Sequence, residues 1–162
     1  MLGFADIINT ELLNKISSKS YIYRGEVDRK FGDYFPTSLD LELKEGAQIM
    51  MIKNESGKWV NGTIGKIESL SEKEIKVNLN EKIHVVEKVI WEKKKFKSVK
   101  GDVKDTVIGS FKQYPIKIAW AITIHKSQGQ TFDKFIVDMS TGAFAHGQTY
   151  VALSRATNFK GI

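Results

Sequence analysis

The chain has 162 residues, 41% hydrophobic and 27% charged, which is typical of a soluble globular protein forming one domain, or one domain with a small inserted one. The sequence contains no apolar run long enough to span a bilayer, no secretory signal and no cysteine, which excludes disulfides and thiolate metal sites and is compatible with a cytoplasmic location. The net charge is +6, and lysines crowd between residues 88 and 104. Such a run indicates either a solvated edge strand or loop, or a surface that contacts a polyanion.

The first forty residues predict a helix, a short strand and an irregular segment. Apolar residues recur at helical spacing over residues 5–17, and Tyr21 to Tyr23 follows as a strand candidate. Residues 25–40 mix charges with Gly32 and Pro36 and have no clear period, so we expect a loop or linker there.

From Leu43 onward, the pattern of apolar residues and turn compositions predicts several short antiparallel strands. Ala47 to Ile52 is the first candidate, and turn compositions follow at residues 54–57 and at Asn61-Gly62. Residues 74–79 alternate strictly, which places Ile75, Val77 and Leu79 on one face, and residues 83–91 form a further candidate. This spacing favours a small antiparallel barrel or sandwich.

From Pro115 to the last residue, the sequence pattern predicts strands that alternate with helices. Ile118 to Ile124 is apolar on both faces, as expected for a central parallel strand covered by helices, and Phe135 to Val137 is a second such strand. Asp138 ends the second strand, where it is either a helix cap or a functional acid.

A dense polar block follows the first of these strands. Lys126 offers a point charge, Gly129 permits close backbone approach, and Thr123, His125, Ser127 and Gln128 offer groups suited to phosphate oxygens. In open α/β sheets the carboxyl ends of the strands carry the ligand site, so the block predicts a binding loop.

Arg155 lies in a stretch that predicts a short helix. Helical spacing places Gln148, Ala152 and Arg155 on one face and Tyr150 and Leu153 on another, which could pack inward. The arginine is then either a ligand-binding residue or a surface residue in a salt bridge.

Some kinds of site are not expected. The nearest approach to a Walker A loop, residues 62–67, has the wrong spacing and carries Ile67 where a hydroxyl is required, so it predicts a β-turn. The histidines His84, His125 and His146 show no paired spacing, and no metal site is predicted.

Two motifs together resemble a known family. Residues 119–131 are similar to motif V, and residues 147–157 to motif VI, of superfamily 1B DNA helicases, the RecD-like and Pif-like enzymes. Residues 43–54 with 60–65 resemble the start of the SH3-like barrel that these enzymes insert into their second RecA-like domain.

The resemblance implies an α/β fold: part of a RecA-like parallel-sheet domain, of the UvrD-like helicase C-terminal kind, with an inserted antiparallel SH3-like β-barrel. The domain boundaries expected from it are 1–42 for the first part of the RecA-like domain and linker, 43–113 for the barrel, and 114–162 for the part bearing motifs V and VI.

The same resemblance implies site residues, cofactors and partners. Thr123, His125, Lys126 and Ser127 belong to the motif associated with the DNA strand, Gly129 and Gln130 lie toward the nucleotide, and Arg155 is the catalytic arginine that reaches the γ-phosphate. The expected partners are single-stranded DNA and a first RecA-like domain, with ATP and Mg²⁺ used by the complete protein and no membrane involved.

The chain lacks the motifs of a first RecA-like domain, so we expect it to bind no nucleotide stably and to be inactive alone. It would be the C-terminal motor part of an ATP-dependent DNA helicase. The alternatives are a free-standing nucleic-acid-binding module without nucleotide hydrolysis, and a protein-interaction module that uses the barrel.

Overall fold

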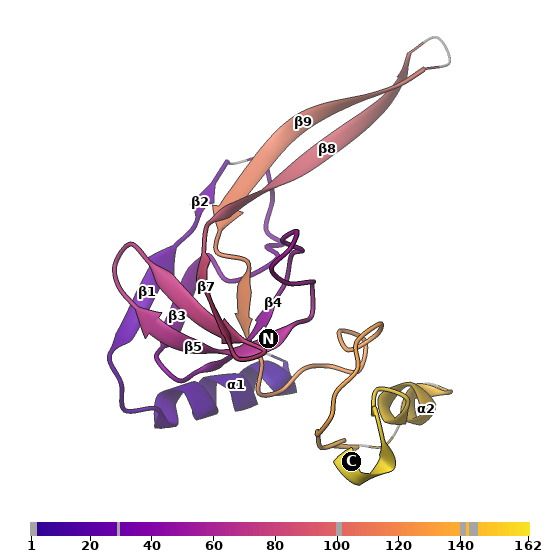
Figure 1. The fold of residues 1–162 in the computed structure, drawn as a ribbon. Helices are drawn as coiled ribbons and strands as arrows, with labels where there is room; N and C mark the ends of the chain where they lie inside the picture. The colour runs from indigo at the N-terminus through magenta and orange to yellow at the C-terminus, as the bar shows by residue number, and fades with distance from the viewer. Residues whose placement is uncertain (1–2, 29, 100–101, 140–141, 143–145) are drawn as a thin grey trace. The chain divides into compact units, whose positions relative to one another are not determined.

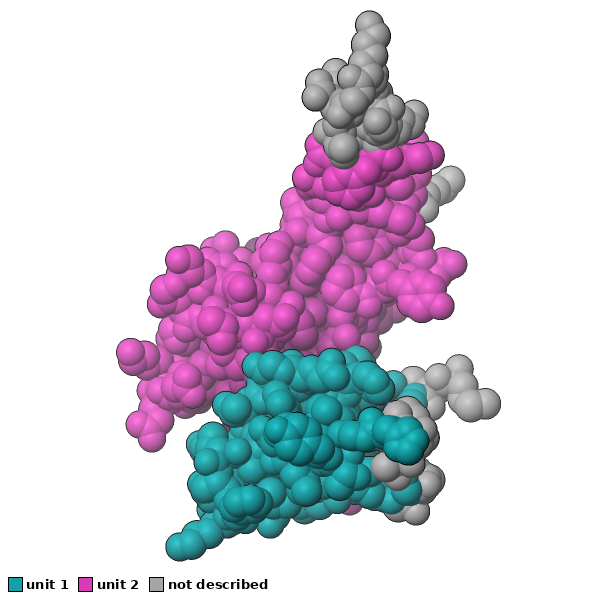
Figure 2. Space-filling model, turned by 90° about the vertical axis from the view of Figure 1, so that its right-hand side faces the viewer, with its two compact units in different colours: residues 1–8, 121–162 teal, residues 9–120 magenta. Residues whose placement is uncertain are grey.

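The described residues form two compact units. The computed structural model describes residues 3–28, 30–99, 102–139, 142 and 146–162. Unit 1 comprises residues 1–8 and 121–162, and unit 2 comprises residues 9–120 (Figure 2). The units are defined by contacts within the chain, so the domain boundaries expected at 42/43 and 113/114 stay a prediction. Within the described part, no helix is both long enough and apolar enough to cross a membrane.

The amino-terminal elements match the sequence prediction. Helix α1 (Phe4–Lys15) is followed by strand β1 (Ser20–Arg24), which pairs antiparallel with β3 (Asp40–Lys44) (Figure 1). Leu13 of the helix and Tyr23 of the strand are buried in the core of unit 2. Between β1 and β3 lies only the short β2 (Glu26–Val27), so the segment expected to be irregular is mostly so.

A five-stranded antiparallel sheet forms the centre of unit 2. Its strands stand in the order β10 (Ile116–Ile118), β4 (Gln48–Met51), β5 (Ile64–Leu70), β6 (Ile75–Leu79) and β7 (Lys82–Val86). Strand β6 alternates as predicted, since Ile75, Val77 and Leu79 are at most 2% exposed. The prediction of short antiparallel strands is therefore confirmed.

The turn between β6 and β7 has an unusual backbone. Asn80 and Glu81 both have positive φ, 49° and 64°, and join the paired residues Leu79 and Lys82. A two-residue hairpin loop with two positive φ angles matches the right-handed twist of its strands. Asn tolerates this conformation, but Glu81 adopts it against a steric cost.

A long hairpin projects from the rest of unit 2 (Figure 1). Strand β8 (Val89–Val99) pairs with β9 (Asp102–Gln113) in a three-stranded sheet ordered β2-β9-β8, so the lysine run lies on an edge strand, one of the two structures that it indicated. The sequence had predicted a single strand over residues 83–91, but the chain divides it into β7 and β8.

The hairpin is irregular at one position and anchored at its base. Lys93 pairs with Gly109 and Lys94 with Val107, which leaves Ile108 as an extra residue in a β-bulge. Gln113, fully buried, donates from Nε2 to the carbonyl of Tyr23 at 2.7 Å. This bond ties the end of β9 to β1.

The two parallel strands predicted near the carboxyl terminus are not present. Strand β10 ends at Ile118, and the structure assigns no strand to residues 119–124 or to residues 135–137, where Ile136 is 93% exposed. A parallel strand needs a neighbouring strand that runs alongside it, and the described sheets contain no such partner for either segment. An apolar run alone could not reveal this, because its period does not distinguish a buried strand from other buried backbone.

Candidate nucleotide and nucleic-acid site

The predicted binding loop is a series of tight turns in unit 1. The Ser127 amide donates to the Thr123 carbonyl at 3.1 Å, and the Gln130 amide donates to the Ser127 carbonyl at 3.1 Å. Gly129 lies in the left-handed region with φ 77°, and no atom would approach a Cβ built on it within 4 Å. The glycine is therefore required by the backbone conformation rather than by crowding.

Three of the four residues expected to contact DNA are exposed. The side chains of Thr123, His125 and Lys126 lie at the surface of the loop. Ser127 is 6% exposed, and its Oγ donates to the Ile124 carbonyl at 2.7 Å. In this conformation the Ser127 hydroxyl shapes the loop, and the surface available to a ligand comes from the other three.

Arg155 lies just beyond helix α2 (Gln148–Leu153) and is bonded to its own surroundings. Its guanidinium donates from Nε to the Val151 carbonyl at 3.1 Å, from Nη2 to Ser154 Oγ at 3.0 Å, and from Nη1 to the Gln130 carbonyl at 3.2 Å. All three acceptors are uncharged. The salt bridge that was one alternative for Arg155 is not among the ion pairs of the described residues.

The expected orientation of this helix is wrong. Ala152 is 4% exposed, whereas Tyr150 is 76% and Leu153 41% exposed, so the Ala152 side packs inward and the Tyr150 side faces solvent. Helical period groups residues on one face but does not say which face meets the rest of the fold.

The loop and the arginine segment lie side by side. The Phe132 amide donates to the Arg155 carbonyl at 2.8 Å, and the Thr157 amide donates to the Phe132 carbonyl at 3.1 Å. Phe132 and Ala156 form a parallel β-bridge. Together with the Arg155–Gln130 bond, these contacts hold residues of the two expected motifs against each other.

Gln130 connects the two halves of this arrangement. Its side-chain Nε2 donates to the Lys126 carbonyl at 3.1 Å, while its main-chain carbonyl accepts from Arg155 Nη1. Its Oε1 is buried and has no hydrogen-bond partner in the described part of the chain. A buried acceptor without a donor costs free energy, so this amide is a place where a donor from outside would be favourable.

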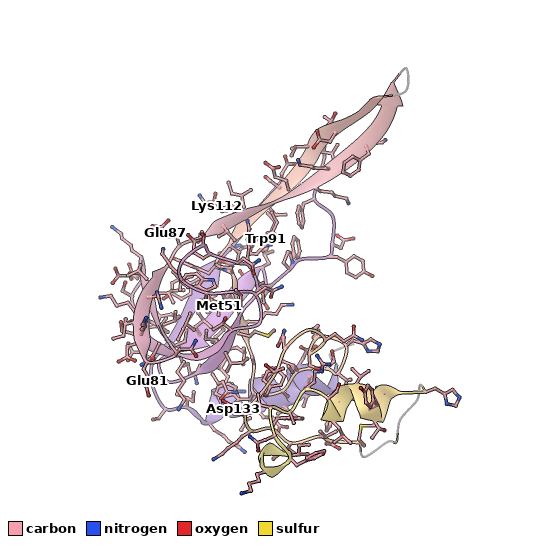
Figure 3. All side chains as sticks on the ribbon, turned by 45° about the vertical axis from the view of Figure 1, so that its right-hand side comes forward. Met51, Glu81, Glu87, Trp91, Lys112 and Asp133 are labelled. Atoms are coloured by element: carbon pink, nitrogen blue, oxygen red, sulfur yellow. The ribbon has the colours of Figure 1, made fainter. Side chains whose placement is uncertain are left out.

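Sequence reasoning missed Phe132 and the 3₁₀ helix Phe159–Gly161. The backbone of Gly161 lies so close to that of Asp133 that a side chain there would collide, and the Phe135 amide donates to the Gly161 carbonyl at 2.8 Å. These contacts fix the segment after the loop. A glycine in an otherwise polar stretch is the only signal that could have indicated them. Figure 3 shows Asp133 in this unit.

Nothing in the described residues forms a group of acidic or histidine side chains that could hold a metal ion. No family model matches the chain.

The known proteins that the chain is similar to are ATP-dependent DNA helicases. Several of them are named Pif1. The chain is 34% identical over 168 residues to the ATP-dependent DNA helicase Pif1 of Campylobacter jejuni, covering 93% of this chain and 37% of that protein. It is 33% identical over 165 residues to the PIF1 helicase of Xenopus laevis, covering 97% of this chain and 25% of the relative. The chain therefore spans well under half the length of the relatives it matches.

The fold matches solved Pif1 structures as well. A Bacteroides Pif1 helicase with two cysteine substitutions superposes with a TM-score of 0.85 at 35% identity, over 100% of this chain and 38% of that one. The Bacteroides protein has also been solved bound to single-stranded DNA (TM-score 0.77, 36% identity, 96% of this chain and 37% of that one). A complex with ADP-AlF4 gives a TM-score of 0.83 at 35% identity, over 99% of this chain and 38% of that one.

Proposed function

We propose that the chain is the part of a Pif1-like ATP-dependent DNA helicase that carries motifs V and VI. In this proposal residues 1–42 and 114–162 belong to the second RecA-like domain, and residues 43–113 form the inserted SH3-like barrel. The observation that carries the proposal is the hydrogen bond between Arg155 and Gln130, which joins the two motifs in one unit. Similarity to Pif1 helicases over nearly the whole chain supports it.

The binding loop supplies the contacts to single-stranded DNA. Thr123, His125 and Lys126 are exposed on one run of turns, and a lysine there neutralises a phosphate and releases its counterion. Ser127 contributes by holding the loop in shape through its bond to Ile124. The Bacteroides relative bound to single-stranded DNA supports this partner.

Arg155 supplies the charge that stabilises phosphoryl transfer. Its guanidinium donates to three neutral oxygens, which lack the attraction between opposite charges that a phosphate oxygen would add. A phosphate oxygen placed beside it would therefore displace the weaker acceptors. Gly129 directly precedes Gln130, whose main-chain carbonyl accepts from Arg155, and in this proposal both residues line the nucleotide. ATP with Mg²⁺ is the substrate of the complete protein, as the ADP-AlF4 complex of the relative supports.

Moving Arg155 to a nucleotide would release the Gln130 carbonyl. Gln130 also holds Lys126 through its side-chain amide, so the change would reach the DNA-binding loop within one residue. Binding of the nucleotide by Arg155 would in this way be coupled to the conformation of the loop that contacts DNA.

The test uses the parent protein that contains this chain. Arg155→Ala is expected to lower ATP hydrolysis by roughly 10³–10⁵-fold, as removal of an arginine finger does elsewhere. Single-stranded DNA affinity should change much less, because the exposed residues proposed to contact the strand, Thr123, His125 and Lys126, all remain in the variant. The chain by itself is expected to hydrolyse no ATP. Steady turnover by the isolated chain that Arg155→Ala abolishes, or full turnover by the Arg155→Ala parent, would refute the proposal.

A further inference from the structure

A second feature of unit 2 lies outside the proposed site. We call residues 30–36 the aromatic loop. Tyr34 lies in this loop and is 96% exposed. Phe31 and Phe35 on either side of it are half-buried, and their rings stack at an interplanar angle of 4° with centroids 5.9 Å apart. Each ring also packs against Phe111 of β9, with centroid distances of 5.7 and 4.8 Å. Phe31 and Phe35 are thus held against β9, while the Tyr34 ring, which lies between them in the sequence, is exposed to solvent.

The backbone of this loop is also fixed to the hairpin. The Phe31 amide donates to the Asp28 carbonyl at 2.8 Å, and Lys93 Nζ donates to the Phe31 carbonyl at 3.0 Å. Gly109 of β9 meets the backbone of Phe31 so closely that any side chain there would collide. A loop held in this way presents Tyr34 without a large cost of ordering on binding.

The two faces of the hairpin differ in charge. Successive strand residues point to opposite faces, and directly paired residues share a face. The face that receives the aromatic loop, which we call the lysine face, carries Trp91, Lys93 and Lys95 from β8 and Thr106, Gly109 and Phe111 from β9. The opposite face carries Ile90, Glu92, Lys94 and Phe96 with Asp105, Val107 and Lys112. Figure 3 shows Trp91 and Lys112 at the base of the hairpin.

No carboxylate of the described strand side chains falls on the lysine face. Lys94, on the opposite face, forms an ion pair with Asp105 at 2.7 Å, whereas Lys95 has no ion pair among the described residues. Lys53 adds a further cation, with Nζ 5.5 Å from the centre of the Trp91 ring. Asp28, in the segment leading into the aromatic loop, and Asp33, in the loop itself, are acidic residues that do not belong to the strands.

We propose that Tyr34 and the lysine face form a second binding site for single-stranded nucleic acid, in which Tyr34 stacks on an unpaired base and Lys93 and Lys95 contact the backbone. Stacking platforms beside a row of cations are the means by which proteins bind single strands without regard to sequence. On the opposite face, Lys94 and Lys112 are paired with carboxylates and Glu92 adds a negative charge, so the row of unpaired cations is specific to one side. The site lies in unit 2 and does not require nucleotide.

The experiment measures binding of the chain to a fluorescent oligothymidylate by anisotropy at low salt. Tyr34→Ala is expected to lower affinity roughly five- to hundredfold, the range seen when a stacking aromatic is removed, and Tyr34→Phe to retain most of it. Phe96→Ala is the matched control, because it removes an exposed aromatic ring, 66% exposed, from the opposite face. Tyr34 makes no core contact, so loss of folding does not complicate the result.

A second set of variants reverses the charge of two neighbouring lysines, and their binding to the same oligonucleotide is measured. Lys95→Glu, on the lysine face, should weaken binding several times more than Lys94→Glu, on the opposite face, although both change the net charge equally. Equal effects of the two lysines, or equal effects of Tyr34→Ala and Phe96→Ala, would overturn the second site.

Lys126→Ala separates this site from the one proposed in unit 1. If Tyr34→Ala weakens binding and Lys126→Ala does not, the second site stands and the DNA contact of the unit 1 loop fails. If only Lys126→Ala weakens binding, the second site is overturned and the function proposed above is unaffected.

Discussion

Arg155 Nη1 lies 3.2 Å from the carbonyl oxygen of Gln130, so the arginine expected to act on a nucleotide is bonded to the loop expected to grip DNA. Two more bonds, to Val151 and Ser154, complete the set for its guanidinium. The planar fork of arginine suits three acceptors at once, and lysine does not have this geometry.

The first prediction follows from this geometry. Arg155→Lys should let the loop and the arginine segment open more often, and hydrogen exchange of the Phe132 amide, which is bonded to the Arg155 carbonyl, should become roughly two- to tenfold faster. Ser154→Ala removes only one of the three acceptors and should produce a smaller change. Unaltered exchange in Arg155→Lys would show that the side chain does not hold the two segments together.

Lys126→Ala should weaken binding of the parent protein to single-stranded DNA. Because one phosphate contact is lost, the slope of log affinity against log salt concentration should fall by about 0.7. Lys160→Ala, an exposed lysine of the 3₁₀ helix in the same unit, serves as the control for net charge. An identical slope for the wild-type protein and Lys126→Ala would remove this lysine from the DNA contacts.

Glu81→Gly should stabilise the chain by about 0.5–1 kcal/mol, since relief of a left-handed residue outweighs the backbone entropy that glycine loses. Urea unfolding measures the change, with Lys82→Gly as the control. Lys82 begins strand β7 and has no positive φ, so glycine there should destabilise. A loss of stability in Glu81→Gly would mean that the turn does not hold both residues at positive φ in solution.

Stability should decline in strongly alkaline solution because of Tyr23. Burial, which is the largest cause, raises the pKa of this phenol to about 12 from 10.0, and nearby Tyr114 contributes further. Its hydroxyl donates to the Ser71 carbonyl at 2.6 Å. The folded chain therefore retains a proton that the unfolded chain releases, so this contribution is complete below pH 10 and is lost as the pH rises toward 12.

Unfolding midpoints in urea across that pH range test the assignment. Tyr23→Phe should lower stability at neutral pH, because the Ser71 carbonyl loses its donor, and should flatten the alkaline decline. Burial also raises the pKa of Tyr114, so Tyr114→Phe should remove a further part. An alkaline decline that is equally steep in Tyr23→Phe would assign it to other groups.

The sequence predicted best those elements whose period depends only on local burial. Strand β6 is the clearest, because Ile75, Val77 and Leu79 alternate with polar residues and all face the core. Asn61-Gly62 also forms the turn that its composition indicates, with Gly62 at φ 95°.

Predictions that needed knowledge of neighbouring elements were less successful. The run Ala119 to Ile124 is apolar but forms no strand, and helix α2 turns Ala152 inward rather than Tyr150. The bond from Arg155 to a main-chain carbonyl carries no sequence signal, because every residue has such a carbonyl. The site residues themselves came from the resemblance, and their proximity came from the fold.

The single extra residue at Ile108 determines the polarity of the hairpin. Because of this bulge, residues 105–107 of β9 point to the faces opposite to those that uninterrupted alternation from Gly109 would give them. Asp105 therefore lies on the same face as Lys94, and Thr106 pairs with Lys95 on the lysine face. If Ile108 instead took part in the regular alternation of β9, Asp105 and Val107 would lie on the other side, which would place a carboxylate among Lys93 and Lys95. The bulge at Ile108, and not the identity of any side chain, thus decides on which side of the hairpin Asp105 lies.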